Sequence, residues 1–199
     1  MRHIIFGESH GPAIGVVLAD PPAGVLLDWD FLRAEMARRA PGQDPTATAR
    51  READEPKILS GVFEGRTTGT PLCAVIENTD TRSKDYAKLK TPPRPSHADY
   101  TGAVRYGGYN DYRGGGHFSG RLTAPLVAAG SVAKQLLAEK NVWVGAHISA
   151  IYGITDAALN DPQELRGVAD KPFPVLDDAK GEEMKKAIAK TYGKKGEDI

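Results

Sequence analysis

The sequence has one cysteine, no net charge and no long apolar run, and each of these absences excludes a class of protein. Cys73 cannot form an internal disulfide, and its apolar setting is typical of a small core residue in a reducing compartment. Twenty-six basic side chains balance 26 acidic ones, so no global field would hold the chain on a nucleic acid or an anionic membrane. The first residues lack the apolar segment of a signal peptide, and no run of about 18 apolar residues occurs. We therefore expect a soluble, cytoplasmic protein.

The size of the chain predicts one domain. Its 199 residues and 21.3 kDa suffice for a hydrophobic core without disulfide or metal support. A hydrophobic content of 40% is ordinary for a globular protein and excludes disorder throughout. We predict a single domain over residues 1–199.

Arginine and lysine are distributed differently along the chain. Twelve of the 13 arginines precede position 130, whereas nine of the 13 lysines follow it. Arginine binds carboxylate and phosphate through a planar, bidentate fork, and lysine is the usual solubilising cation of exposed helices. The chemistry is therefore expected before residue 130.

Short apolar runs bounded by Gly, Pro, Asp or Asn predict strands, and longer periodic segments predict helices. The strands are expected at 2–6, 14–19, 58–63, 72–76 and 142–151, and the helices at 30–40, 123–140 and 178–192.

The helix at 123–140 has the clearest pattern. Thr123 is its expected N-cap, and the spacing of six residues predicts one buried face. These are Leu126, Val127, Gly130, Ala133, Leu136 and Leu137.

The first motif is the glycine-flanked turn FGESHG at 6–11, with His10 at its tip. Glycines on both sides let the backbone approach another group closely, and the histidine titrates near neutrality. A single histidine in a turn is also common at a protein surface. Glu8, Ser9 and His10 do not form a catalytic triad by sequence alone, since adjacent residues need not face one another.

The second motif, RPSHADY at 94–100, places a guanidinium and an imidazole on either side of a rigid proline. His97 and Asp99 are one residue apart, and no partner His or Cys lies at ligand spacing. We therefore predict two hydrogen-bond donors in one loop, Arg94 and His97, and no metal.

The third motif, YNDYRGGGHFSGR at 109–121, puts a triple glycine just before the predicted helix at 123–140. Exposed backbone N–H groups near a helix N-terminus, flanked by Arg113 and Arg121, favour an anion. A flexible glycine hinge is one alternative. An RNA-binding segment is another, because Tyr and Phe alternate with Gly and Arg. Together the three motifs suit a small ligand with several negative charges and acid–base chemistry near neutral pH.

The amino-acid sequences of these motifs resemble the signatures of the chorismate synthase family. FGESHG at 6–11, RPSHADY at 94–100 and DYRGGGHFSGRLTA at 111–124 occur in family order, with RREADEPKILSGVFEGRTTGTP at 50–71 and IENTDTRSKDY at 76–86 between them. The resemblance is dense over about residues 4 to 140.

The resemblance implies an anti-1,4-elimination of phosphate from 5-enolpyruvylshikimate 3-phosphate to give chorismate, with reduced FMN as cofactor and NADPH as a possible external reductant. His10 would donate a proton to the leaving phosphate side and His97 to the reduced flavin. The remaining site residues carried over are His97, His117, Phe118 and Ser119 for the flavin, and Arg39, Arg94 and Arg121 for the substrate or nucleotide.

The family resemblance also implies an α+β fold, a β-α-β sandwich of antiparallel sheets and helices, and a homotetramer. Family members are roughly twice as long, so we expect this chain to be an N-terminal portion of such a protein. One alternative is therefore a non-catalytic fragment of the enzyme. The other, an RNA-binding module, is disfavoured because Asp99 and Asp111 interrupt the basic run.

Overall fold

The computed structural model describes residues 1–40, 53–79 and 92–192. These residues form two compact units. Unit 1 contains the described residues up to 141, and unit 2 contains 142–192. The single domain expected over 1–199 stays a prediction. No described helix is both long and apolar enough to span a membrane.

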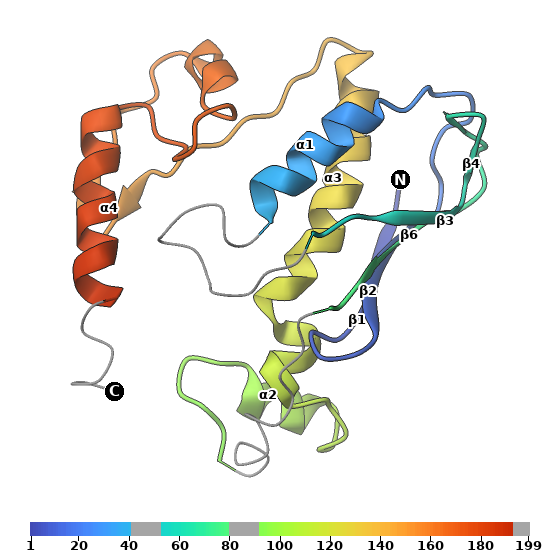
Figure 1. Cartoon of the computed structure of the whole chain (residues 1–199), viewed down its shortest axis with the longest axis horizontal. Helices are drawn as coiled ribbons and strands as arrows, with labels where there is room; N and C mark the ends of the chain where they lie inside the picture. Colours follow the sequence, from blue (N-terminus) through green and yellow to red (C-terminus); the bar gives the residue numbers. More distant parts are fainter. Residues whose placement is uncertain (41–52, 80–91, 193–199) are drawn as a thin grey trace. The chain divides into compact units, whose positions relative to one another are not determined.

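Four antiparallel strands form the sheet of unit 1 in the order β1-β2-β6-β3 (Figure 1). Every second residue of the two central strands points to the core, because side chains alternate along a strand. The predicted strands at 2–6, 14–19 and 72–76 are confirmed. The bounds are β1 (His3–Gly7), β2 (Ala13–Leu18), β3 (Lys57–Ser60) and β6 (Leu72–Glu77).

The expected strand at 58–63 is divided. Its pairing with β6 shifts register between Ile58 and Ser60, and β3 ends there. The remainder forms a small hairpin of β4 (Val62–Phe63) and β5 (Arg66–Thr67).

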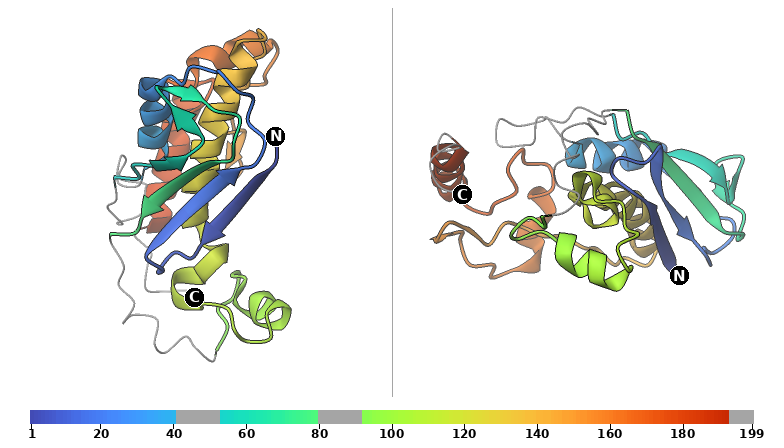
Figure 2. Two further views of the ribbon diagram at one scale, coloured as in Figure 1. Left: turned by 90° about the vertical axis from the view of Figure 1, so that its right-hand side faces the viewer. Right: turned by 90° about the horizontal axis from the view of Figure 1, so that it is seen from below.

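Two helices, α1 (Trp29–Arg39) and α3 (Thr123–Ala138), pack together on one face of this sheet, as both panels of Figure 2 show. Asp28 caps α1 by accepting a hydrogen bond from the backbone N–H of Phe31. Leu32 and Met36 of α1 are buried in the core. The core thus lies between one sheet and two helices.

The buried face of α3 differs from the predicted one. Leu126 and Gly130 are exposed, and Leu136 and Leu137 are half-buried. The buried side chains are smaller: Ala124, Pro125, Ala128, Ala129, Ser131 and Val132. Small residues let the helix axis approach the sheet closely, so packing distance rather than side-chain size decides which face is inside. The expected N-cap is also wrong, because Thr123 Oγ1 donates to the Gly120 carbonyl.

The segment before α3 contains the second and third motifs and three short helices. They are α2 (Asp99–Arg105) and the 3-10 helices η2 (Arg113–Phe118) and η3 (Gly120–Leu122). Ser119 caps η3 by accepting from the backbone N–H of Arg121.

Unit 2 contains a two-stranded hairpin, a 3-10 helix and one long helix. Its elements are β7 (Ala150–Ile151), β8 (Ile154–Thr155), η4 (Pro162–Gly167) and α4 (Asp178–Tyr192). The predicted helix at 178–192 is confirmed, with Met184 fully buried. The predicted strand at 142–151 is wrong except for its last two residues, because the backbone N–H of Ile148 donates to Pro174 instead of to a neighbouring strand.

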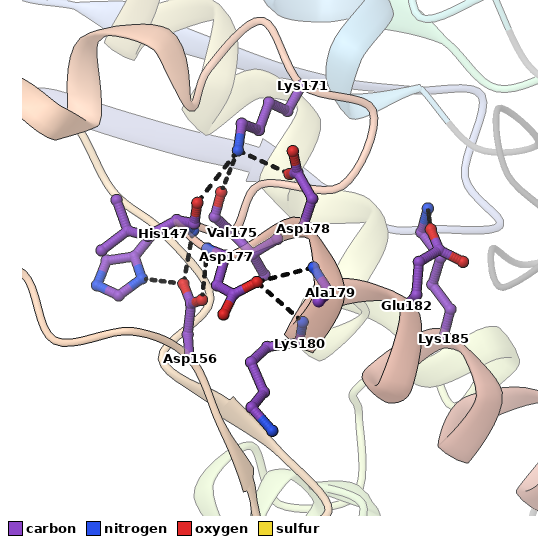
Figure 3. A network of polar contacts seen from close by, with 11 residues as sticks. His147, Asp156, Lys171, Val175, Asp177, Asp178, Ala179, Lys180, Glu182 and Lys185 are labelled. Atoms are coloured by element: carbon purple, nitrogen blue, oxygen red, sulfur yellow. Dashed lines mark hydrogen bonds and ion pairs between the residues drawn. The ribbon is translucent and has the colours of Figure 1, made fainter.

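A buried carboxylate organises unit 2 (Figure 3). Asp156 accepts hydrogen bonds from the backbone N–H groups of Leu176 and Asp177 and from His147 Nδ1, at 2.7, 2.9 and 2.9 Å. Burial raises the pKa of Asp156, but the backbone and histidine hydrogen bonds outweigh it and lower the pKa to about 2. The hairpin is thereby fastened to the start of α4.

Candidate active site

The FGESHG turn is docked on the triple-glycine loop. The backbone N–H of Ser9 donates to the Gly116 carbonyl at 3.1 Å, and His117 Nδ1 lies 2.9 Å from the Gly7 carbonyl oxygen. Asn78, just after β6, holds the turn from another side by donating to the carbonyls of Glu8 and Gly11. Two motifs more than 100 residues apart in the sequence therefore form one structure.

Ser9 is fully buried and fixes the His10 ring. Its Oγ lies 3.1 Å from His10 Nδ1, 3.2 Å from the Arg113 carbonyl oxygen and 3.1 Å from the Gly114 carbonyl oxygen. Carbonyl oxygens only accept, so the hydroxyl proton points to one of them and Oγ accepts from Nδ1–H. Proton transfer by His10 would then take place at Nε2.

The triple glycine is required by close contact as well as by its backbone angles. Gly114 and Gly116 have φ angles of 57° and 55°, which disfavour side chains. A Cβ at Gly114 would lie 2.2 Å from Cε1 of His10, and one at Gly116 would lie 2.0 Å from the Asp111 carbonyl oxygen. The imidazole of His10 therefore rests directly on the glycine backbone.

Asp111 and Arg113 form an ion pair beside His10. Arg113 Nη2 donates to Asp111 Oδ2 at 2.7 Å and its Nε to Oδ1 at 2.9 Å. The Arg113 hydrogen bond outweighs burial and lowers the pKa of Asp111, and the nearby His10 adds to this lowering. An ionised carboxylate thus lies in the field of the His10 imidazole.

A cleft of about 480 Å³ opens between β1 and the loop that carries these motifs. His117 and Phe118 line it, as does Glu8 of the turn. Phe118 lies 6.1 Å from Tyr106, ring centroid to centroid, at an angle of 42°. The other lining residues are Ile5, Phe6, Gly7, Tyr109, Asn110 and Asp111. The cleft offers aromatic surface together with a few polar groups, as small-molecule sites do.

The RPSHADY loop reaches the same region through Arg94. A Cβ at Gly115 would lie 3.9 Å from Arg94 Nη2. Arg94 is also paired bidentately with Asp99, at 2.8 and 2.9 Å, and this hydrogen bonding lowers the pKa of Asp99 to about 2. His97 is exposed, and its Nδ1 lies 2.9 Å from the Pro95 carbonyl oxygen.

The remaining predicted arginines converge on a buried aspartate. Arg39, at the end of α1, donates to Oδ2 of Asp54, and Arg121 donates to Oδ1 of the same carboxylate. Arg121 also donates to Asn78 Oδ1 at 3.0 Å. Its side chain is 2% exposed and that of Arg39 is 19% exposed. Arg39 lines a second cleft, of about 420 Å³, between α1 and α3.

The structure thus gathers His10, His117, Phe118 and Arg94 around the triple glycine. It places Arg39 in the second cleft and His97 at the surface. Ser119 caps η3 at the end of the same loop. Across the described ranges, no group of three or more His, Cys, Asp or Glu side chains is arranged as a metal site.

Sequence reasoning missed three residues that hold this arrangement: Ser9, Asp54 and Asn78. Ser9 lies inside a recognised motif, so its place beside the histidine was the available signal. Asp54 lies in a charged run that reads as a solvated surface, and nothing in the sequence marks it as buried.

Comparison with known proteins identifies the family. Residues 1–198 match the profile of chorismate synthase. The chain is 50% identical over 161 residues to chorismate synthase from Thermococcus kodakarensis, covering 81% of this chain and 44% of that protein. It is 45% identical over 189 residues to the Aeropyrum pernix protein of the same name, covering 94% of this chain and 50% of that one.

A crystal structure of chorismate synthase matches with a TM-score of 0.70 and 27% identity, over 97% of this chain and 54% of that one. The predicted α+β class is confirmed by this match and by the mixture of helices and antiparallel sheets. The chain spans about half the length of the curated relatives it matches. On the evidence of profile, identity and fold together, the chain belongs to the chorismate synthase family.

Proposed function

We propose that this chain serves the elimination of phosphate from 5-enolpyruvylshikimate 3-phosphate to give chorismate, as a lyase of aromatic amino acid biosynthesis. The observation that carries the proposal is the docking of the FGESHG turn on the triple-glycine loop, which sets His10 on the glycine backbone. Glu8 of the same turn and His117 of the same loop line the cleft with its aromatic residues. Family membership supports the reaction, and this geometry supports His10 as a proton donor.

His10 is proposed as the proton donor to the leaving phosphate. Ser9 holds the ring through Nδ1, so proton transfer takes place at Nε2. The ionised Asp111 carboxylate, paired with Arg113, lies in the field of the imidazole. The histidine is thus held in one orientation beside a carboxylate.

The cleft of about 480 Å³ fits reduced FMN, because its volume is in the usual range for cofactor sites and Phe6, Tyr106, Tyr109 and Phe118 give it aromatic walls. When bound, the reduced flavin supplies electron density to the departing phosphate. We assign His117 and Phe118 to the wall of this site and Ser119 to its loop. His97 is proposed as a proton donor toward the flavin, and its exposure leaves it accessible.

Arg39 and Arg94 are proposed to bind a substrate with a phosphate and two carboxylates, and Arg121, whose side chain is 2% exposed, to serve the same site from its buried position. Guanidinium groups bind such oxyanions through paired hydrogen bonds. The partner is thus a small molecule. A cytoplasmic homotetramer that takes NADPH as external reductant completes the proposal by family resemblance.

The test is chorismate formation under anaerobic conditions with chemically reduced FMN. It is run on this chain and on this chain extended by the second half of the Aeropyrum pernix relative, called the extended chain below. Chorismate formed by the extended chain supports the proposal. A folded extended chain that binds reduced FMN and the substrate but forms no chorismate overturns it.

A non-catalytic role for the chain alone is the second candidate, because the chain spans about half the length of its relatives. Several contacts to a charged ligand, each worth about 1–3 kcal/mol, set flavin affinity, so a site with half of them binds many-fold more weakly. We expect no turnover by the chain alone. Steady-state turnover without the extension would exclude this candidate.

A further inference from the structure

Asp54 is a buried carboxylate shared by two guanidinium groups. Its side chain has no exposed surface, and each of its oxygens accepts from a different arginine, Oδ2 from Arg39 and Oδ1 from Arg121. The two arginines come from the end of α1 and from η3, which are 82 positions apart in the sequence. One carboxylate therefore joins two separate segments of unit 1.

The two arginines of this cluster differ in exposure. Buried charges need partners. Arg121, whose side chain is 2% exposed, also donates to Asn78 Oδ1 and, at 3.4 Å, to the Glu77 carbonyl oxygen. Arg39 is 19% exposed and lines the cleft of about 420 Å³. Of the two guanidinium groups, that of Arg39 is therefore the one that borders a cleft.

The Arg39 guanidinium has a fixed place at the start of α3. Besides Asp54, its Nε lies 3.4 Å from Thr123 Oγ1 and its Nη2 lies 3.4 Å from the Gly120 carbonyl oxygen. Both distances are long for hydrogen bonds, so the Asp54 contact is the strong one. This point adjoins the loop that carries the triple glycine and borders the cleft of about 420 Å³.

We propose that Asp54 is a positioning residue, which holds Arg39 so that its guanidinium binds an oxyanion of the substrate at the cleft between α1 and α3. This inference rests on the function proposed above. Arg121 acts within it as the buried anchor of Asp54. The backbone φ of Asp54 is 51°, in a region that Asp and Asn tolerate better than other side chains, so an asparagine can take its place.

The test variant is Asp54→Asn, which keeps the size and the backbone tolerance but removes the charge. The variant makes the cluster more positive, so an electrostatic role alone would tighten the binding of an anion. If Asp54 instead holds Arg39 in position, the variant should bind the anion more weakly. We expect the dissociation constant for 5-enolpyruvylshikimate 3-phosphate, measured by calorimetry on the chain and the extended chain, to rise about tenfold.

The matched control is Asp30→Asn, in the exposed pair Arg33–Asp30 of α1, the helix that ends at Arg39. It changes the net charge by the same amount, and we expect the dissociation constant for the substrate to change less than twofold. Chorismate, which lacks the phosphate but keeps both carboxylates, is titrated in parallel. Weakening confined to the phosphorylated ligand places Arg39 on the phosphate, and weakening of both ligands places it on a carboxylate.

If Asp54→Asn does not fold, as judged by circular dichroism, the comparison is made in an Arg121→Gln background. There, removing Asp54 leaves no buried guanidinium unpaired, and Arg39 can reach water. Substrate affinity should fall about tenfold from Arg121→Gln to the double variant. Equal substrate affinity of Arg121→Gln and the double variant overturns the positioning role. So does an effect of Asp30→Asn on substrate affinity as large as that of Asp54→Asn.

Flavin binding, followed by quenching of FMN fluorescence, separates this inference from the proposed function. Unchanged flavin affinity with weakened substrate binding in Asp54→Asn supports the positioning role. A wild-type extended chain that binds neither flavin nor substrate overturns both proposals. Normal binding of both by wild type and variant overturns only the role of Asp54.

Discussion

Asp54 in unit 1 and Asp156 in unit 2 are both aspartates with no exposed side-chain surface, yet their partners differ in kind. Asp54 is held by two arginine side chains from distant segments. Asp156 is held by two neighbouring backbone N–H groups and by a histidine nine residues away. The first arrangement concentrates formal charge beside a cleft, and the second neutralises a charge with dipoles.

This difference matches the distribution of arginine and lysine. In unit 1, arginine forks are paired with carboxylates around the motif loops, as in Arg94–Asp99 and Arg113–Asp111. In unit 2, the ammonium of Lys171 donates to the carbonyls of Val175 and Leu176 and to Asp178, which ties the chain into α4 (Figure 3). We therefore propose ligand chemistry for unit 1 and a structural role for the unit 2 network.

The largest expected effect comes from comparing one histidine of each unit. In the extended chain, His10→Ala should lower turnover about 10²–10⁴-fold, which is the usual share of a general acid, with flavin affinity retained. His147→Ala should leave the turnover number within about twofold, because His147 contacts Asp156 and belongs to a structural network. Steady-state rates of chorismate formation measure both. Equal losses in the two variants would break the assignment.

The free energy of unfolding should depend on the unit 2 network, in contrast to the turnover number. Asp156→Ala leaves the backbone N–H groups of Leu176 and Asp177 without their acceptor, and we expect a loss of about 3 kcal/mol in the free energy of unfolding. Urea denaturation followed by Trp143 fluorescence, in a Trp29→Phe background, reports on unit 2. The control is Asp170→Ala at an exposed position, expected within about 0.5 kcal/mol of the parent. Similar losses in the two would remove the structural role of Asp156.

The elements that sequence predicts best are those in which local pattern and packing agree. The alternation in β2 and β6 and the spacing of Leu32 and Met36 in α1 produce the observed core. The pattern fails in part in α3, where the larger residue Leu126 is exposed and Leu136 is only half-buried, while alanines are fully buried. Close approach to the sheet selects small side chains. The distance between helix and sheet cannot be inferred from the spacing of residues within one helix.

The candidate site also has features that the sequence predicts and features that it does not. The glycine-rich turns are visible in the sequence because their backbone angles demand glycine. The partners of the charged residues are not, since pairing is decided by segments far apart, as Arg121 with Asn78 and Asp54 illustrates. A run such as RREADE therefore reads as surface although Asp54 is buried.

Acid should weaken unit 2 in a defined range of pH. The pKa of Asp156 is about 2 in the folded protein and ordinarily 3.8, so the unfolded chain binds more protons between these values. The stabilisation is complete above about pH 4 and falls as the pH drops towards 2, by about 2 kcal/mol in total. Urea titrations with Trp143 fluorescence from pH 5 to 2 measure this fall. Asp156→Asn should be less stable at pH 5 and should lose less over the range, and a parallel fall in both proteins would contradict the role of this carboxylate.

The smallest expected effect concerns geometry at constant charge. Arg39→Lys keeps the positive charge beside the second cleft but loses the fork that reaches Asp54 and an oxyanion together. We expect substrate binding about tenfold weaker, by calorimetry on the extended chain. Arg33→Lys, in the exposed pair with Asp30, is the matched substitution and should change affinity less than twofold, because exposed pairs contribute little. If both lysine variants bound the substrate like wild type, Arg39 would have no more part in substrate binding than Arg33, and Asp54 would be a structural residue like Asp156.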